Sequence, residues 1–181
     1  NDLRTRMKPF VRDINYIHGN VEVIYVNDPL SDLAIKDIIN KLNNSDIIII
    51  SMLIRIKMDK GISTIHQTHN NLLIEIKKLN IPMIGLSFGS PYLPNYKNLD
   101  SYLCTYGYGL VSLSAATNAL FGRAEISGKL PVNLNGNYQF NFGIDVKKKD
   151  KIFESELNID LEEPLQIIKK AIDNNVFPGA Q

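Results

Sequence analysis

The chain alternates between short apolar runs and longer stretches in which apolar residues recur every three or four positions. The first pattern is typical of buried strands, and the second of helices that cover a sheet. We therefore predict strands and helices in alternating order. The helices are expected over residues 5–18, 31–42, 64–79 and 109–121. The strands are expected over residues 21–26, 46–53, 81–88, 101–106 and 128–134.

Three of these segments have features that sharpen the prediction. Ser31 is placed to cap the helix over 31–42. The run DIIIISML at 46–53 is almost entirely apolar, which predicts a strand covered on both faces. Pro131 has no N–H group, so the strand at 128–134 is expected at an edge of the sheet. The alternation predicts an α/β fold class, a three-layer α/β/α sandwich with a mostly parallel sheet.

This alternation does not continue to the end of the chain. Residues 1–145 are expected to form the α/β domain, and the charged residues 146–157 a linker. Residues 158–181 are expected to hold an amphipathic helix and the start of a further domain. Asp160 and Glu163 have the spacing of a capping box at the start of that helix.

Composition narrows the classes of partner. The chain has 181 residues, of which 44% are apolar and 22% charged, which suits a globular domain with a core. The net charge of +1 favours neither nucleic acid nor an anionic membrane, and no apolar run is long enough to span a bilayer. Cys104 is the only cysteine, which excludes an internal disulfide and a cysteine-based zinc site. The first ten residues lack a signal-peptide core and are expected to be the interior of a longer protein.

Residues 85–89 read GLSFG, which fits the G-x-S-x-G pattern of a nucleophile elbow. An elbow places its serine on a sharp turn between a strand and a helix. Pro91 and Pro94 disfavour such a helix after Ser87, and all three histidines precede Ser87 instead of following it. We favour a tight turn in which Ser87 and Ser90 satisfy backbone groups. A free-standing hydrolase that uses Ser87 is the alternative.

The basic loop RIKMDKG at 55–61 is the candidate for substrate binding. It follows the most apolar strand, and open α/β sheets bind ligands at the carboxyl ends of their strands. Arg55, Lys57 and Lys60 are therefore the candidate substrate-binding residues, with a solvated basic loop as the alternative for each.

The sequence implies no metal and no organic cofactor. His66 and His69 have the spacing of neighbouring helix turns but lack a third ligand, so packing or surface roles are favoured. There is no P-loop and no G-x-G-x-x-G after the first strand. A flavodoxin-like small-ligand module is a further alternative, although no phosphate-binding loop supports it.

Several motifs occur together in a fixed order. They are IRIKMDKG at 54–61, SFGSPY at 87–92, ALFG at 119–122 and GKLPV at 128–132. In combination they resemble the C-terminal α/β sandwich domain of family 3 glycoside hydrolases, in the branch of β-N-acetylglucosaminidases. The resemblance covers about residues 5–145. NYQFNFGI at 137–144 departs from it, because the family more often has a G-x-G-L ending there.

The resemblance implies a supporting part in glycoside hydrolysis. Such a domain packs on an N-terminal catalytic (β/α)8 barrel, which hydrolyses terminal β-N-acetylglucosamine or related β-glycosides with a nucleophile and an acid/base residue. Carbohydrate would then reach this chain through the barrel. No Glu of this chain matches an acid/base motif of the family, so the chain is expected to contain no catalytic residue.

The final segment carries a second resemblance. IDLEEPLQIIKKAIDNNVFPGAQ, at 159–181, is similar to the opening helix of serine β-lactamase-like domains. It implies a parent protein in which a family 3-like hydrolase is fused to such a domain. The sequence does not fix the compartment; the periplasm or export in a Gram-negative bacterium is the expectation for a parent of this kind.

Overall fold

The computed structural model describes residues 3–26, 29–54, 56–57, 62–63, 66–93, 96–134 and 138–149. The chain divides into the units Asn1–Lys148 and Lys149–Gln181, and every helix and strand described belongs to the first. The predicted helix that opens at residue 158 lies outside the described residues, as does most of the predicted linker over 146–157.

The described elements follow the predicted order. The helices are α1 (Leu3–His18), α2 (Asp32–Leu42), α3 (Gln67–Lys77) and α4 (Leu110–Leu120), with the short 3-10 helix η1 (Tyr96–Asn98). The strands are β1 (Ile48–Ile54), β2 (Ile56–Lys57), β3 (Ile62–Ser63), β4 (Met83–Gly89) and β5 (Ser101–Cys104). The predicted helices are confirmed within a few residues, as are the predicted strands at 46–53, 81–88 and 101–106.

One side chain caps the start of a helix, and another links a helix to the sheet. The Ser31 hydroxyl accepts the N–H of Ala34 at 3.2 Å, which confirms the predicted cap of α2. The Asp100 carboxylate accepts the N–H of Met83 at 2.8 Å and the Lys77 ammonium at 2.7 Å. This carboxylate thereby links the end of α3 to the start of β4.

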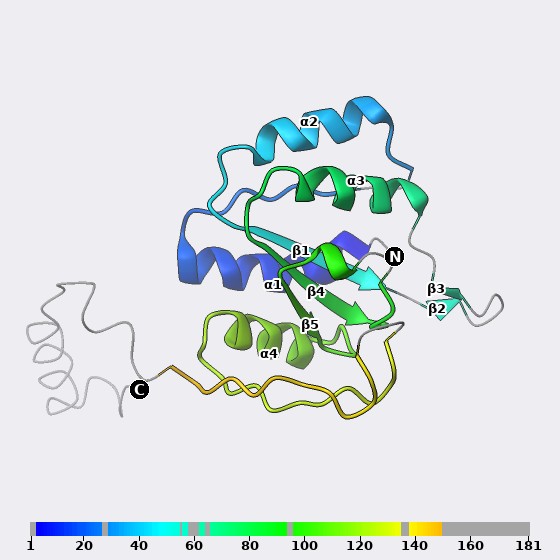
Figure 1. Cartoon of the computed structure of the whole chain (residues 1–181). Coiled ribbons are helices and arrows are strands. Elements are labelled where there is room, and N and C mark those ends of the chain that lie inside the picture. The colour runs from blue at the N-terminus through cyan, green and yellow to red at the C-terminus, as the bar shows by residue number, and fades with distance from the viewer. Residues whose placement is uncertain are drawn as a thin grey trace, which may run out of the picture. The chain divides into compact units, whose positions relative to one another are not determined.

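The main sheet has the order β1-β4-β5, and both pairs are parallel (Figure 1). Ile48 is paired with Met83 at one end of the β1–β4 ladder, and Ile54 with Gly89 at the other. β2 and β3 form a separate antiparallel hairpin that directly follows β1. Because the strands are parallel, the loops that leave β1, β4 and β5 gather at one edge, here called the carboxyl edge.

Helices cover both faces of the sheet, which confirms the three-layer α/β/α fold. On one face α1 and α4 enclose the first core cluster, whose buried members are Phe10, Ile14, Leu86, Phe88, Leu113 and Ala116. On the other face α2 and α3 enclose the second cluster, formed by Ile35, Ile38, Ile48, Leu72, Ile76 and Met83. β4 contributes alternate side chains to the two clusters, as a strand covered on both faces must.

A third, smaller cluster lies beside these layers. Leu93, Tyr96 and Leu134 are its buried members, and Tyr102 and Tyr138 pack against it. The Tyr96 ring stacks on Tyr102 with 6.1 Å between centroids and lies 5.9 Å from Tyr138. This cluster attaches the segment after β4 and the segment after α4 to the sheet.

The predicted strand at 21–26 is wrong. These residues have no regular secondary structure, although Val21 packs against the first cluster and Ile24 against the second. Residues three apart in an extended chain point in opposite directions, so the segment runs as a strand would. It is not a strand because no described backbone pairs with it.

The predicted edge strand at 128–134 is also wrong. Only isolated bridges occur here, Ile126 with Val146 and Leu134 with Tyr138. Leu130 exchanges backbone hydrogen bonds with Phe142 and Asn141 at 2.8 Å. The segment therefore turns back on the residues that follow it, instead of joining the main sheet.

Candidate functional site

Ser87 does not lie on an elbow. It is in the body of β4, is fully buried, and is paired with Met52 on one side and Cys104 on the other. After β4 the chain continues as a loop and then forms η1, so no α-helix begins at this serine. Gly89 ends the strand with φ +110°, a conformation that favours glycine. A Cβ on Gly85 would overlap the Leu99 side chain, so this glycine allows close packing.

The polar groups around Ser87 are directed at the backbone. The Ser87 hydroxyl donates to the Ser90 carbonyl at 2.7 Å, and the Ser90 hydroxyl lies 3.4 Å from the N–H of Tyr92. The backbone N–H of Thr105 donates to the Ser87 carbonyl at 3.0 Å, and the Thr105 hydroxyl reaches the same oxygen. These contacts give Ser87 and Ser90 the turn-shaping role that the sequence favoured. No described residue accepts the Ser87 proton as a base.

Three titratable groups near this turn, Tyr102, Cys104 and Tyr106, have raised pKa values. Burial raises the pKa of Tyr102, whose hydroxyl donates to the Pro91 carbonyl at 2.9 Å. Burial also raises the pKa of Cys104 to about 11. The pKa of Tyr106 is raised to about 12, first by partial burial of its hydroxyl and then by Cys104 and Tyr92 nearby. Thiolate or phenolate chemistry therefore has no support here.

Apolar and aromatic side chains are exposed at the same carboxyl edge. Tyr92 is 40% exposed and Tyr106, at φ +56°, is 43% exposed. Leu110 is 71% exposed and Val111 is 85% exposed in the first turn of α4. These four residues are here called the carboxyl-edge surface. Sequence reasoning missed it, although two apolar residues directly after the Gly109 cap were a readable signal.

The predicted basic site is only partly described. Arg55 and Lys60 lie outside the described residues. Lys57 is in β2, where it is paired with Ile62 of β3, in the hairpin that directly follows the carboxyl end of β1 (Figure 1). The proposed contact of these three residues with substrate stays a prediction.

The two spaced histidines have separate roles. His66 caps α3, because its Nδ1 lies 3.3 Å from the N–H of Thr68 and 2.9 Å from the Thr68 hydroxyl. His69 lies on the half-buried side of the same helix. No group of three metal-ligating side chains occurs within the part of the chain that the structure describes.

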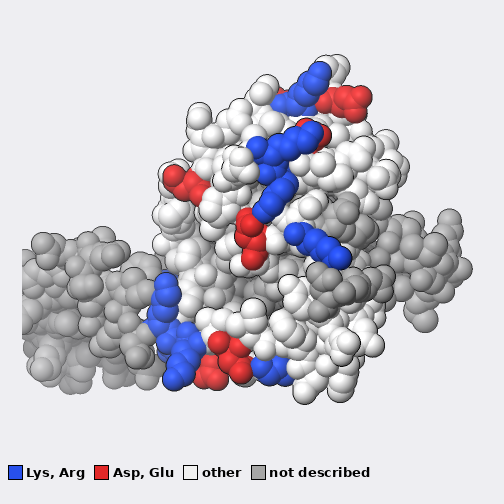
Figure 2. All heavy atoms as spheres, in the orientation of Figure 1, with Lys and Arg blue, Asp and Glu red and all other residues white. Residues whose placement is uncertain are grey.

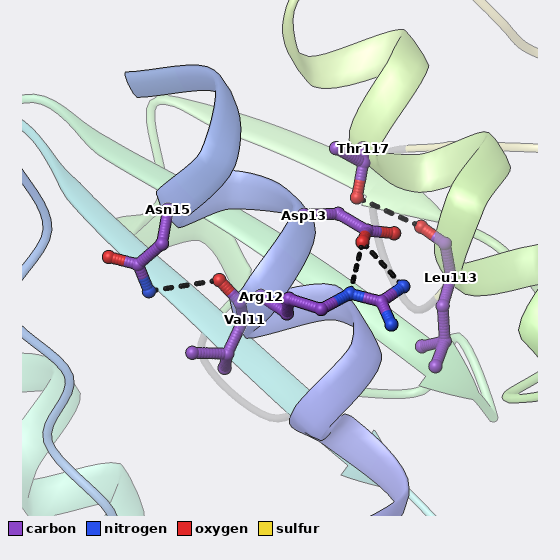
Figure 3. Close-up of polar contacts among 6 residues, drawn as sticks. All are labelled: Val11, Arg12, Asp13, Asn15, Leu113 and Thr117. Atoms are coloured by element: carbon purple, nitrogen blue, oxygen red, sulfur yellow. Dashed lines mark hydrogen bonds and ion pairs between the residues drawn. The ribbon is translucent and has the colours of Figure 1, made fainter. Parts of the chain in front are cut away.

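A shallow polar cavity of about 150 Å³ lies between α1 and α4. Its lining includes Asp13, Asn118 and Arg123. Asp13 projects from α1 toward Thr117 of α4, but its carboxylate is engaged by Arg12 at 2.8 Å (Figure 3). The Thr117 hydroxyl donates to the Leu113 carbonyl at 3.1 Å. The Asp13 carboxylate is thus paired with Arg12 and the Thr117 hydroxyl with the helix backbone, and neither points to a reaction in this cavity.

Surface charge is mixed on the face shown in Figure 2, where basic and acidic side chains lie next to each other. Lys41 pairs with Asp37 at 2.8 Å, and Lys78 with Glu75 at 2.6 Å.

None of the described helices combines the length and apolar character that crossing a bilayer requires.

No protein-family model matches the chain, and no curated protein matches it either. The sheet topology shows an α/β fold with a three-stranded parallel sheet, and no family is identified.

Proposed function

We propose that this chain is the non-catalytic second domain of a family 3-like glycoside hydrolase. It would pack on a catalytic (β/α)8 barrel that hydrolyses terminal β-N-acetylglucosamine or related β-glycosides. The observation that carries the proposal is the carboxyl-edge surface of Tyr92, Tyr106, Leu110 and Val111, which offers a docking face where open α/β sheets usually hold a ligand.

The first turn of α4 is the clearest sign of docking. Acidic or capping side chains stabilise the start of a helix, and α4 has neither an acidic residue in that turn nor a side-chain cap. Leu110 and Val111 occupy this turn instead, and the exposure of their apolar side chains to water is unfavourable for the isolated chain. Apolar and tyrosine side chains are common in the cores of protein interfaces, which accounts for them.

The interior of the carboxyl edge also favours a supporting role. Glycoside hydrolysis of this class needs two carboxyl groups at the scissile bond. The described groups around Ser87 are hydroxyls, phenols and a thiol; the Ser87 and Tyr102 hydroxyls donate to backbone carbonyls, and burial raises the pKa of Cys104. The chemistry would therefore belong to the barrel. Lys57 of β2, with Arg55 and Lys60 of the same basic segment of the sequence, would border the sugar cleft.

A charge placed in the docking face tests the proposal. Val111→Asp puts a carboxylate in the first turn of α4, where the helix dipole favours it, so the isolated chain should stay folded. In the parent protein the same carboxylate would be buried against the barrel without a partner. We expect turnover of a chromogenic β-N-acetylglucosaminide to fall at least about tenfold, and protease to separate the domains faster.

Leu33→Asp is the matched control. Leu33 is also an exposed apolar residue in the first turn of its helix, but α2 covers the opposite face of the sheet. The control should leave turnover and protease resistance unchanged. Equal effects of the two substitutions, or no effect of Val111→Asp, would overturn the docking role of the carboxyl-edge surface.

A further inference from the structure

The outer edge of β1 is unpaired. The N–H of Ile48 donates to the Pro82 carbonyl at 2.9 Å, which shows that the backbone groups of Ile48 face β4. In a parallel strand, successive residues direct their backbone groups to opposite sides. The groups of Ile49, Ser51 and Leu53 therefore face away from β4. No strand among the described residues pairs with them, since β1 ends the sheet (Figure 1).

This edge has the character of a central strand. Ile49 and Leu53 pack against the first core cluster, and Ile50 packs against the second. Ser51, in the middle of the strand, is exposed. A long strand that is apolar on both faces is typical of the interior of a parallel sheet, whereas natural edges are short, charged or covered.

A second unpaired segment accompanies it. Residues 21–26 reach both core clusters through Val21 and Ile24, yet no backbone hydrogen bond joins them to any other described residue. Val23, Tyr25 and Val26 are exposed. β-Branched and aromatic residues of this kind favour a strand. Residues 21–26 are thus a second unpaired segment suited to a sheet, and they pack against the same two clusters as β1.

We propose that the free edge of β1 accepts an additional strand from another polypeptide segment. The segment would be extended and apolar on both faces, and it would run parallel to β1 as β4 does. The edge of the added strand that faces β1 would form backbone hydrogen bonds with Ile49, Ser51 and Leu53. Its opposite edge would form backbone hydrogen bonds with residues 21–26. Recognition would follow strand addition, in which main-chain hydrogen bonds give affinity and alternate side chains give specificity.

A second copy of this chain fits the edge less well. Two β1 edges related by a twofold axis would pair antiparallel, because a twofold contact uses the same surface on both copies. That contact would leave residues 21–26 unpaired. The proposal is independent of glycoside hydrolysis and does not involve the carboxyl-edge surface.

Amide hydrogen exchange of the whole chain, followed by NMR, tests this inference. The probe is the capped peptide Lys-Val-Ile-Val-Val-Ile-Lys. Without it, the amides of Ile49, Ser51 and Leu53 should exchange much faster than those of Ile50 and Met52. Saturating peptide should slow exchange at Ile49, Ser51 and Leu53 by about tenfold or more, with slower exchange also within residues 21–26.

Two controls separate strand addition from apolar adhesion. The same peptide with N-methyl groups along the edge that faces β1 cannot bond the strand and should give no protection. Ser51→Pro removes one outward N–H and leaves the β4 ladder intact, so it should abolish protection that Ser51→Ala retains. If Ser51→Pro does not fold, the comparison of the peptide with its N-methylated form tests the proposal by itself.

Three results would overturn the proposal. The first is unchanged exchange at Ile49, Ser51 and Leu53 with saturating peptide. The second is equal protection by the N-methylated peptide. The third is protection without peptide that rises with protein concentration alongside a dimer in sedimentation, which would assign the edge to a second copy.

Discussion

Replacing Ser87 with alanine distinguishes a structural serine from a catalytic one. The Ser87 hydroxyl is fully buried and donates to the Ser90 carbonyl at 2.7 Å. The alanine variant leaves that carbonyl without its partner in a site closed to water. An unsatisfied buried group costs about 1–3 kcal/mol, and each kcal/mol lowers the Tm of a domain of this size by roughly 2–4 °C. We therefore expect the free energy of unfolding to fall by about 1–3 kcal/mol.

Urea unfolding followed by far-UV circular dichroism measures this change. Ser114→Ala is the control, because Ser114 is exposed on α4 and its replacement should stay within about 0.5 kcal/mol of the wild type. A Ser87→Ala variant as stable as the wild type, or more stable, would refute the reasoning. Catalytic residues are often held at a cost to stability, so their removal tends to stabilise the protein.

Three further predictions concern the core and two titratable groups. Phe88 is fully buried, and its ring meets Phe10 edge to face with 5.2 Å between centroids. Phe88→Ala should therefore lower the free energy of unfolding in urea by about 3–5 kcal/mol, and a loss below about 1 kcal/mol would contradict this packing. Hydrogen bonds from Lys77 and then Met83 lower the pKa of Asp100, so its stabilising effect is present above the ordinary aspartate pKa of about 3.9 and is lost as the pH falls through the lowered value. Asp100→Asn should therefore lower the Tm near neutral pH and converge with the wild type in strong acid; a constant gap would contradict this. Burial raises the pKa of Cys104 to about 11, whereas a free thiol has a pKa of about 8.5. The alkylation rate of Cys104 should therefore keep rising with pH after the rate of a free thiol has become constant.

Much of the fold could be predicted because the relevant signals are local. The almost entirely apolar run at 46–53 predicted a strand covered on both faces, and β1 contributes side chains to both clusters. Ser31 predicted the start of α2 because a cap depends only on neighbouring residues. The pattern therefore specified the layers without any knowledge of strand order.

The failures share a different cause, which is dependence on distant partners. VEVIYV at 21–26 has the composition of a strand, but a strand exists only when another backbone pairs with it. G-x-S-x-G is likewise defined by spacing, whereas an elbow is defined by the turn that carries it. Tyr92 and Tyr106 meet at the carboxyl edge only because β4 and β5 are neighbours, which the sequence does not state.

Turnover by this chain alone, on a chromogenic β-N-acetylglucosaminide and a chromogenic acetate ester in one preparation, tests most directly whether the domain carries chemistry of its own. Folded protein is predicted to hydrolyse neither substrate. Ester hydrolysis that disappears in Ser87→Ala would make Ser87 a nucleophile and contradict a supporting role. Glycoside hydrolysis by the chain alone would contradict it as well, because the carboxyl groups of a complete active site would then lie within these residues.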